Sequence, residues 1–539
     1  MVCLRPAGGC LSQDLQARLD EAARVHAQGD IGAAAALYHK ILGQSPRHPI
    51  ALHMLGVIAL QEGKAELALQ LIDAALTAQT DNLQAHLNRS IALRAMGRNA
   101  EALESARKIL QSAPDFAEAW DVAGQILKED GAYTEAAKCF AHAVGLQPGN
   151  AHFHGNYSAL LFAQGDVYAA YKMARKAESL DPSYPPMVLG NFLKAYGYPE
   201  RAAACFARAR TQPILFAEAS ASEAMVHLQM GDFEQGWDLW EHRPDLESAL
   251  AALPFWQGEK IARLLLYEDQ GLGDAMQFLR YIPLLKNRAD HVTLRLREPL
   301  LRLCAHNFPE IDIVTETAEA PSVDARCRLS SLPFFFSTRL HTIPPAPYLT
   351  APDNAAWRYR LSGVPTPRIG LVWAGNVNFR NDAQRSINFE TLQPLLDCGA
   401  PYFVSLQKDR PHHPATAEVF DAALQLHDFA DTAALIGTLD LVISVDTASA
   451  HLAGSLGKPV FVLLPFNSDW RWLLGREDSP WYGSARLFRQ KKFGDWDSVI
   501  ATVADEVRKF IAGDTSVLHA AKWSGDNLRQ NPDALSLPV

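Results

Sequence analysis

Small and acidic residues follow a short apolar run late in this chain, in an arrangement that could bind a phosphate group. Residues 440–465 predict a strand at 441–445, a turn at Asp446, a helix of small residues and a second strand at 460–464. Units of this kind have parallel strands, and open α/β sheets bind ligands where such strands end. The helix opens with Thr447 and Ala448, so its backbone N–H groups and positive dipole end suit a phosphate. In the alternative interpretation, Asp446 only caps the helix and the small residues only allow close packing.

A second candidate is Asp274, which follows a predicted strand at 263–267 and opens a helix predicted for about 275–286. The loop before it contains Gln270, Gly271 and Gly273. This spacing is a weak dinucleotide-binding signal because the third glycine is missing and no acid follows at the ribose distance. We interpret the glycines as a tight turn that lets a ligand come close. Asp274 is then either a functional carboxylate at the end of a strand or an ordinary helix-capping aspartate.

A third group consists of polar and basic residues on two loops. Asn376, Arg380 and Arg385 lie in a loop after a predicted strand at 369–373, and Ser405 and Lys408 end the next predicted strand, at 402–406. Arginine side chains hold anions through paired N–H groups. If both loops open toward the helix that follows Asp446, they predict a pyrophosphate site. The alternative is a solvated loop without a ligand.

The sequence also bears on metals. No acidic cluster with the spacing of metal ligands accompanies these loops. The charge on a leaving diphosphate would therefore be met by arginine, lysine and the helix dipole, without a metal or other cofactor. His451 lies four residues after Thr447 and faces either the sheet or the ligand; a lone helical histidine is more often structural.

Two α/β units are expected to position these residues. Short apolar runs alternate with helical patterns from residue 255 onward, and a Pro-rich stretch at 343–353 divides them. The alternation predicts two Rossmann-like domains that face a cleft, at 255–345 and 346–512. Residues 513–539 are polar, have no clear period and predict a loose tail.

The first half of the chain is a helical repeat. Glycines recur every 34 residues, with alanines and prolines at the same step, and the glycine positions are 29, 63, 97, 131 and 165. This period, with Gly between two helices and Pro after the second, is typical of tetratricopeptide repeats. The array is predicted for residues 12–245, with a shortened sixth repeat and a divergent seventh. Such arrays stack into a groove that usually holds a polypeptide, although self-association is the other interpretation.

Composition restricts the class of protein. The net charge is −10, whereas a nucleic-acid-binding protein needs a basic face. The seven cysteines have no CxxC spacing, which fits a reducing compartment and predicts no zinc site. No apolar run approaches the length of a membrane span, and the N-terminus lacks the apolar core of a signal peptide. We expect a cytoplasmic protein without a membrane span.

Three stretches of the second half resemble a known family. They are GLGDAMQFLRYIPLL (271–285), GLVWAGN (370–376) and SVDTASAHLAGSLGKPVFVLL (444–464), and they are similar to the two-domain GT-B glycosyltransferases of the heptosyltransferase-like group. The resemblance implies that Asp274 is the base that activates the acceptor hydroxyl. It further implies that the donor phosphates bind at a turn and a basic loop, made here by Asp446, Thr447, Ala448 and His451 with Arg380 or Arg385.

Two other segments point to a protein acceptor. Residues 466–490 are not typical of heptosyltransferases; with residues 231–243 they look like bacterial proteins that fuse tetratricopeptide repeats to such a domain. Flagellin glycosyltransferases have this layout, as does the eukaryotic protein O-linked N-acetylglucosamine transferase. In that eukaryotic family a row of asparagines grips the peptide backbone; only Asn88 and Asn156 stand at its positions here, so the sequence does not predict such a row.

The resemblance implies an inverting, metal-independent enzyme that moves a sugar from a nucleotide sugar to Ser or Thr of a protein docked on the repeats, flagellin being one candidate. Fusion architecture is an analogy and does not itself identify a site. Two alternatives stay open. One is a glycan- or lipid-directed glycosyltransferase, and the other is a scaffold protein whose transferase half is degenerate.

Overall fold

The computed structural model describes residues 13–164, 166–181, 186–245, 247–318, 322–377, 382–399, 402–408 and 419–520. The chain separates into two compact units, residues 1–184 and 185–539. Three parts of the predictions lie outside the described residues. They are Gly165 of the repeat pattern, Arg380, and the predicted tail from residue 521 onward.

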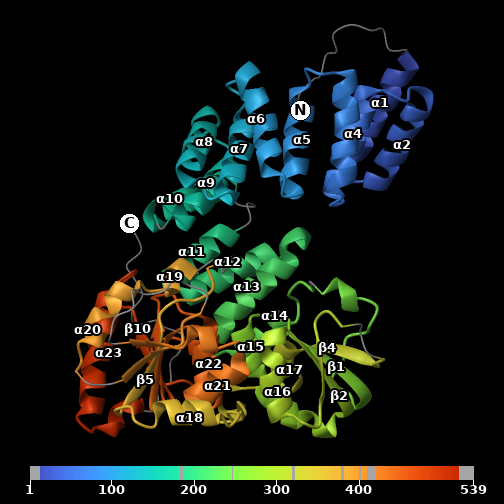
Figure 1. The fold of residues 1–539 in the computed structure, drawn as a ribbon. Helices are drawn as coiled ribbons and strands as arrows, with labels where there is room; N and C mark the ends of the chain where they lie inside the picture. The colour runs from blue at the N-terminus through green and yellow to red at the C-terminus, as the bar shows by residue number, and fades with distance from the viewer. Residues whose placement is uncertain are drawn as a thin grey trace. The chain divides into compact units, whose positions relative to one another are not determined.

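The first unit is an array of helix pairs (Figure 1). Its described helices are α1 (Gln13–Ala27), α2 (Ile31–Gln44), α3 (Pro49–Gln61), α4 (Ala65–Ala78), α5 (Leu83–Ala95), α6 (Asn99–Ser112), α7 (Ala117–Glu129), α8 (Tyr133–Leu146), α9 (Ala151–Ala163) and α10 (Val167–Leu180). The repeated glycines end helices with positive φ angles, for example 75° at Gly63. A Cβ atom on Gly124 would lie 2.9 Å from the Phe140 ring, so the small residue lets the paired helices approach.

The second unit begins with four further helices that the sequence predicted as the last repeats. They are α11 (Met187–Ala195), α12 (Pro199–Arg210), α13 (Phe216–Gln229) and α14 (Phe233–Trp240). Aromatic rings join α14 to the α/β part of the same unit: Trp237 packs edge-on against Trp470 at 5.4 Å, and Phe233 stacks on Trp481 at 5.8 Å. These helices therefore share a hydrophobic core with the sheets.

The first sheet has four parallel strands in the order β3-β2-β1-β4. They are β1 (Ile261–Tyr267), β2 (Ala289–Leu296), β3 (Asp312–Thr315) and β4 (Ala325–Arg328), with the helices α15 (Leu272–Phe278), α16 (Leu301–Asn307) and α17 (Leu332–Phe335). In the central strand, Leu264, Leu265 and Leu266 are fully buried, as expected for a parallel strand covered on both faces.

The second sheet is parallel throughout, in the order β10-β9-β8-β5-β6-β7. Its strands are β5 (Arg368–Val372), β6 (Tyr402–Ser405), β7 (Val419–Asp421), β8 (Leu441–Val445), β9 (Val460–Leu464) and β10 (Ala485–Arg489). Its helices are α18 (Ala355–Leu361), α19 (Asp382–Arg385), α20 (Gln393–Leu396), α21 (Phe429–Gly437), α22 (Ala448–Ser455) and α23 (Trp496–Ile511). Two parallel sheets with helices thus follow the repeat array, and β8 and β9 have the predicted bounds.

Several elements differ from the predictions. The helix predicted for 275–286 ends at Phe278 and continues as a 3-10 helix over Leu279–Asn287, in which Pro283 cannot donate an α-helical hydrogen bond. The same alternation of apolar runs and helical patterns predicts a strand near 328–330 and a helix at about 389–396. The strand lies earlier, at β4, and the helix is a 3-10 turn followed by α20. At the start of the predicted tail, Thr515–Leu518 forms a 3-10 turn in which Val517 and Leu518 are buried.

Candidate functional site

The turn after β8 leads into a helix whose first N–H groups have no side-chain cap. The N-cap residue of α22 is Thr447, with extended backbone (φ −142°, ψ 172°) and no capping hydrogen bond from its side chain. Its hydroxyl instead lies 3.0 Å from the Ser444 hydroxyl. The first N–H groups of a helix have no partner within the helix, so those of Ala448 and Ser449 are positioned to meet an anion. Asp446 precedes the cap and does not cap this helix.

The loop before α15 lies against the start of α22. A Cβ atom on Gly273 would lie 2.8 Å from Cδ2 of His451 and 3.2 Å from Cα of Ala448. Two loops that are far apart in the sequence, one from each sheet, therefore meet at the carboxyl ends of β1 and β8. This contact places the loop that precedes Asp274 beside the turn predicted to bind phosphate, and any side chain at position 273 would separate them.

Asp274 makes two strong contacts. Its Oδ2 accepts a hydrogen bond from the Gly271 N–H (2.7 Å), and its Oδ1 is paired with Nη2 of Arg471 (2.6 Å). The first contact is the helix cap that the sequence offered as one interpretation. The side chain keeps 22% of its surface exposed. Burial raises the pKa of the Asp274 carboxyl above its ordinary value, against the opposing charge of Arg471.

Arg471 is a site residue that the sequence did not predict. It lies in the 3-10 helix Trp470–Trp472 and is buried, with 7% exposure. Besides Asp274, its guanidinium donates to Gln277 Oε1 from Nε and to Asp469 Oδ1 from Nη1, both at 2.7 Å. The only sequence signal was the dense mixture of acidic, basic and aromatic residues around it, in the segment that is atypical of heptosyltransferases.

Arg385 contacts the turn after β8. Its Nη1 donates to the backbone oxygen of Asp446 (3.0 Å), and its Nε contacts Asp382 Oδ1 (3.3 Å). Burial, reinforced by the negative charge of Asp469, raises the pKa of Asp446 to about 6. The positive charge of Arg385 opposes that shift. The turn therefore combines a cation with a buried carboxyl group whose pKa is raised.

His451 packs inside the protein. Its Nδ1 lies 2.9 Å from the Tyr482 hydroxyl, and its ring stacks on Trp472 with centroids 5.3 Å apart. Burial lowers the pKa of His451 to about 3, so the ring is neutral at physiological pH. Its Nε2 is 3.9 Å from Asp446 Oδ1. This packing favours the structural interpretation of His451, in which the buried ring stabilises the turn.

The predicted residues Ser405 and Lys408 lie at the end of β6 and in the loop after it. Ser405 is buried and accepts the Gln407 N–H at 3.3 Å, so it does not open onto the ligand face as expected. The side chain of Gln407 instead fixes the loop after β5 by accepting the Trp373 and Ala374 N–H groups. Lys408 donates to the backbone oxygen of His427 (3.1 Å), ahead of α21.

Two further predicted residues lie on exposed or half-buried loops. Asn376 is exposed, next to the Gly375 N–H that donates to the Ser386 hydroxyl at 3.0 Å. Gln270 is half-buried, and its backbone oxygen accepts from Arg297 Nη2 at 2.7 Å. Both therefore belong to loops that are tied down by neighbouring groups.

The structure holds no candidate metal centre in the ranges it describes: no group of three or more His, Cys, Asp or Glu side chains there could hold an ion. Within the same ranges, no helix has the length and apolar character needed to cross a membrane.

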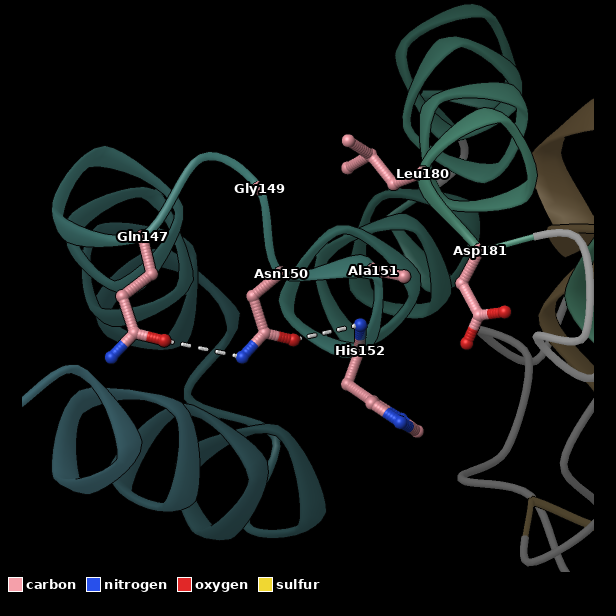
Figure 2. Close-up of a pocket in the computed structure, with 7 residues that line it drawn as sticks. All are labelled: Gln147, Gly149, Asn150, Ala151, His152, Leu180 and Asp181. Atoms are coloured by element: carbon pink, nitrogen blue, oxygen red, sulfur yellow. Dashed lines mark hydrogen bonds between the residues drawn. The ribbon is translucent and has the colours of Figure 1, made fainter. Parts of the chain in front are cut away.

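Polar contacts join neighbouring repeats of the first unit. Nδ2 of Asn156 lies 3.0 Å from both carboxylate oxygens of Asp121, and Nδ2 of Asn88 lies 2.8 Å from Nε2 of His53. Asn88 and Asn156, the two asparagines at positions of the row seen in the eukaryotic family, thus make hydrogen bonds within the array. A separate pocket lies where the α8–α9 connection meets the end of α10 (Figure 2), and it is lined by Gln147, Gly149, Asn150, Ala151, His152, Leu180 and Asp181.

The comparisons with known proteins agree with the repeat pattern. Residues 19–82 and 87–151 match the family model of the tetratricopeptide repeat. The first unit carries tetratricopeptide repeats. The chain is also 25% identical over 525 residues to Protein FlbA of Caulobacter vibrioides, an alignment that covers 90% of this chain and 82% of that protein.

Solved structures of repeat proteins are similar to part of the chain. A tetratricopeptide repeat protein from Parabacteroides merdae is 18% identical, with a TM-score of 0.36, and the match covers 43% of this chain and 92% of that one. The repeat protein TTC0263 from Thermus thermophilus is 20% identical, with a TM-score of 0.30, over 36% of this chain and 99% of that one.

Proposed function

We propose that this protein is a GT-B glycosyltransferase that moves a sugar from a nucleotide sugar to a Ser or Thr hydroxyl of a protein. The observation that carries the proposal is the contact between Gly273 and the start of α22. It brings a half-buried carboxylate, Asp274, next to a helix N-terminus that suits a phosphate. A general base and a leaving-group site must be adjacent for the transfer of a sugar.

The donor phosphates bind, in this proposal, at the N–H groups of Ala448 and Ser449. The helix dipole and the guanidinium of Arg385, held 3.0 Å from the Asp446 backbone oxygen, supply positive charge there. A low-dielectric site strengthens such contacts, and fixed donors need little reorganisation as negative charge develops on the leaving diphosphate. No step of this binding needs a metal ion.

Asp274 acts as the base. Each carboxylate oxygen has one donor, Gly271 or Arg471, and an oxygen with two lone pairs can accept another hydrogen bond. The raised pKa of Asp274 makes its carboxylate a stronger base than an exposed aspartate. The acceptor oxygen attacks the anomeric carbon, the bond to the diphosphate oxygen breaks, and the hydroxyl proton passes to Asp274, with inversion of configuration.

The repeat array is the proposed docking surface for the acceptor. Stacked helix pairs present long grooves, and such grooves usually bind polypeptides. Because Asn88 and Asn156 are bonded within the array, we do not assign them to backbone gripping. Residues 231–243 and 466–490 resemble bacterial proteins that fuse tetratricopeptide repeats to a glycosyltransferase domain. Because flagellin glycosyltransferases have this layout, a flagellin is the first acceptor to test.

The proposal is tested by comparing two aspartate variants of the full chain. Asp274→Asn should reduce transfer at least ~100-fold, the usual contribution of a general base, while calorimetry shows unchanged nucleotide-sugar binding. Asp290→Asn is the matched control, since Asp290 lies on the same sheet, is exposed and pairs with exposed Lys260 at 3.3 Å. Full transfer activity in Asp274→Asn would refute the role of this residue.

A second candidate function is a protein-binding scaffold with an inactive transferase half. The observation that favours it is the short Arg471–Asp274 ion pair, which already occupies the carboxylate. A scaffold would bind protein partners through the repeats and show no affinity for any nucleotide sugar.

A further inference from the structure

We propose that Arg471 is a positioning residue of the transfer reaction, which clamps α15 to the segment 466–490 and holds the Asp274 carboxylate toward the acceptor hydroxyl. The inference rests on the proposed function and concerns the same site. It assigns a role to a residue in the part of the chain that departs from heptosyltransferases.

The contacts of Arg471 explain why the residue has to be an arginine. Its Nη2 and Nε bind Asp274 and Gln277, which are three residues apart and so lie on one face of α15. Its Nη1 binds Asp469 on its own segment. A planar guanidinium with donors in fixed directions satisfies all three acceptors at once, whereas the compact ammonium of a lysine cannot span them.

The segment that carries Arg471 is itself held firmly. The guanidinium lies over the Trp470 ring, 4.3 Å from its centroid, and Trp470 packs against Trp237 of α14 and Trp481. Leu473, two residues on, is fully buried with φ of 54°, a conformation that is unfavourable for leucine. Such a residue is kept only where its surroundings fix the backbone. The clamp therefore has a rigid base.

The charges around Asp274 give the clamp a measurable effect. Burial is the largest influence on the pKa of Asp274, and the charges of Arg471, Asp469 and Asp269 act on it together with the Gly271 N–H. Of these, Arg471 and the N–H favour the charged carboxylate, and the two aspartates disfavour it. Removal of the Arg471 charge should raise the pKa of Asp274 further. Because only the deprotonated base works, the acidic limb of the pH–rate profile then moves to higher pH.

The test compares Arg471→Met and Arg471→Lys in the full chain. Arg476→Met is the matched control, because Arg476 is a buried arginine of the same segment that binds Asp478 at 2.7 Å. For Arg471→Met we expect the acidic limb to rise by about 1 pH unit or more and kcat to fall at least ~10-fold, with donor Kd within about threefold of wild type. Arg471→Lys should reverse part of the pH shift seen in Arg471→Met but recover little of kcat. Lysine restores the positive charge but lacks the planar set of donors of the guanidinium.

Several results would overturn the inference. An unchanged acidic limb in Arg471→Met, whether kcat falls or not, would show that Arg471 is a purely structural residue.

Carbodiimide labelling of Asp274 as a function of pH, measured by peptide mass spectrometry, gives a readout that needs no turnover. If wild type transfers no sugar, the proposed function fails. A labelling profile that shifts in Arg471→Met would still show the ion pair, and one that does not shift would refute the clamp as well.

Discussion

His451 Nε2 lies 3.9 Å from Asp446 Oδ1 at the start of α22. Burial lowers the pKa of His451 and raises the pKa of Asp446, so the two residues change the stability of the fold with pH in opposite directions. Burial holds the His451 pKa at about 3, so this ring stabilises the fold fully above its unfolded value of about 6.5 and loses that effect as the pH falls. Burial raises the Asp446 pKa to about 6, so its contribution is full below about 3.9 and is lost as the pH rises through 6. Between pH 7 and 5.5 the two effects partly cancel.

Replacement of His451 by Gln separates the two effects. The amide cannot titrate but can still hydrogen-bond to Tyr482, so His451→Gln should lose about 1 kcal/mol less stability than wild type between pH 7 and 5.5. Urea denaturation at the two pH values measures the difference. His519→Gln, at an exposed position, is the control. Equal pH dependence in wild type and His451→Gln would contradict the buried, neutral ring.

At the scale of elements, strands made of continuous apolar runs could be predicted from the sequence, whereas long-range contacts could not. The runs at β8 and β9 predicted both strands residue by residue, because parallel strands are buried on both faces. β10 was missed because two arginines interrupt its apolar residues. Arg471 could not be assigned from spacing, since its partner Gln277 lies 194 residues away.

The positions of two candidate loops could be predicted from the sequence, because they follow the ends of strands. The turn at Asp446 and the loop at Gly273 were placed by strand ends, which sequence patterns locate well. Ser405 was expected to face the ligand because it ends a strand, but β6 lies between two neighbouring strands of a parallel sheet, and its residues Phe403–Ser405 are all buried.

The meeting of α15 and α22 can be tested at Gly273. In Gly273→Ala the new methyl group would lie 2.8 Å from the His451 ring and 3.2 Å from the Ala448 backbone. Overpacking of this kind usually costs about 1–3 kcal/mol, and it should weaken donor binding because α22 must shift. Gly363→Ala is the control, with nothing within 4 Å of its new methyl. Equal denaturation midpoints for both variants would argue against the close contact of the two loops.

At the scale of the whole molecule, the helices α11–α14 belong to the same compact unit as the sheets. Arg243, just after α14, pairs with Asp269 at 3.0 Å and donates to the Ser330 hydroxyl at 2.7 Å, both at the first sheet. With the rings of Phe233 and Trp237, these contacts make the helices α11–α14 a structural part of the second unit.

Truncation tests this organisation. A chain that starts at residue 186 should keep a cooperative thermal transition, because it retains α11–α14. A chain that starts at residue 246 should bind a hydrophobic dye and lose that transition, since the partners of Phe233 and Trp237 become exposed to water. Equal thermal stability of the two shortened chains would show that α11–α14 contribute little to this unit.

The central claim, a nucleotide-sugar site at the start of α22, is tested most directly by calorimetry on the full chain. Titration with UDP, CMP, GDP and ADP sugars should show binding of at least one of them. Ser449→Asp should abolish that binding while the fold survives, because an acidic residue suits a helix N-terminus but repels a phosphate. Absence of binding across the panel, or unchanged affinity in Ser449→Asp, would contradict the account.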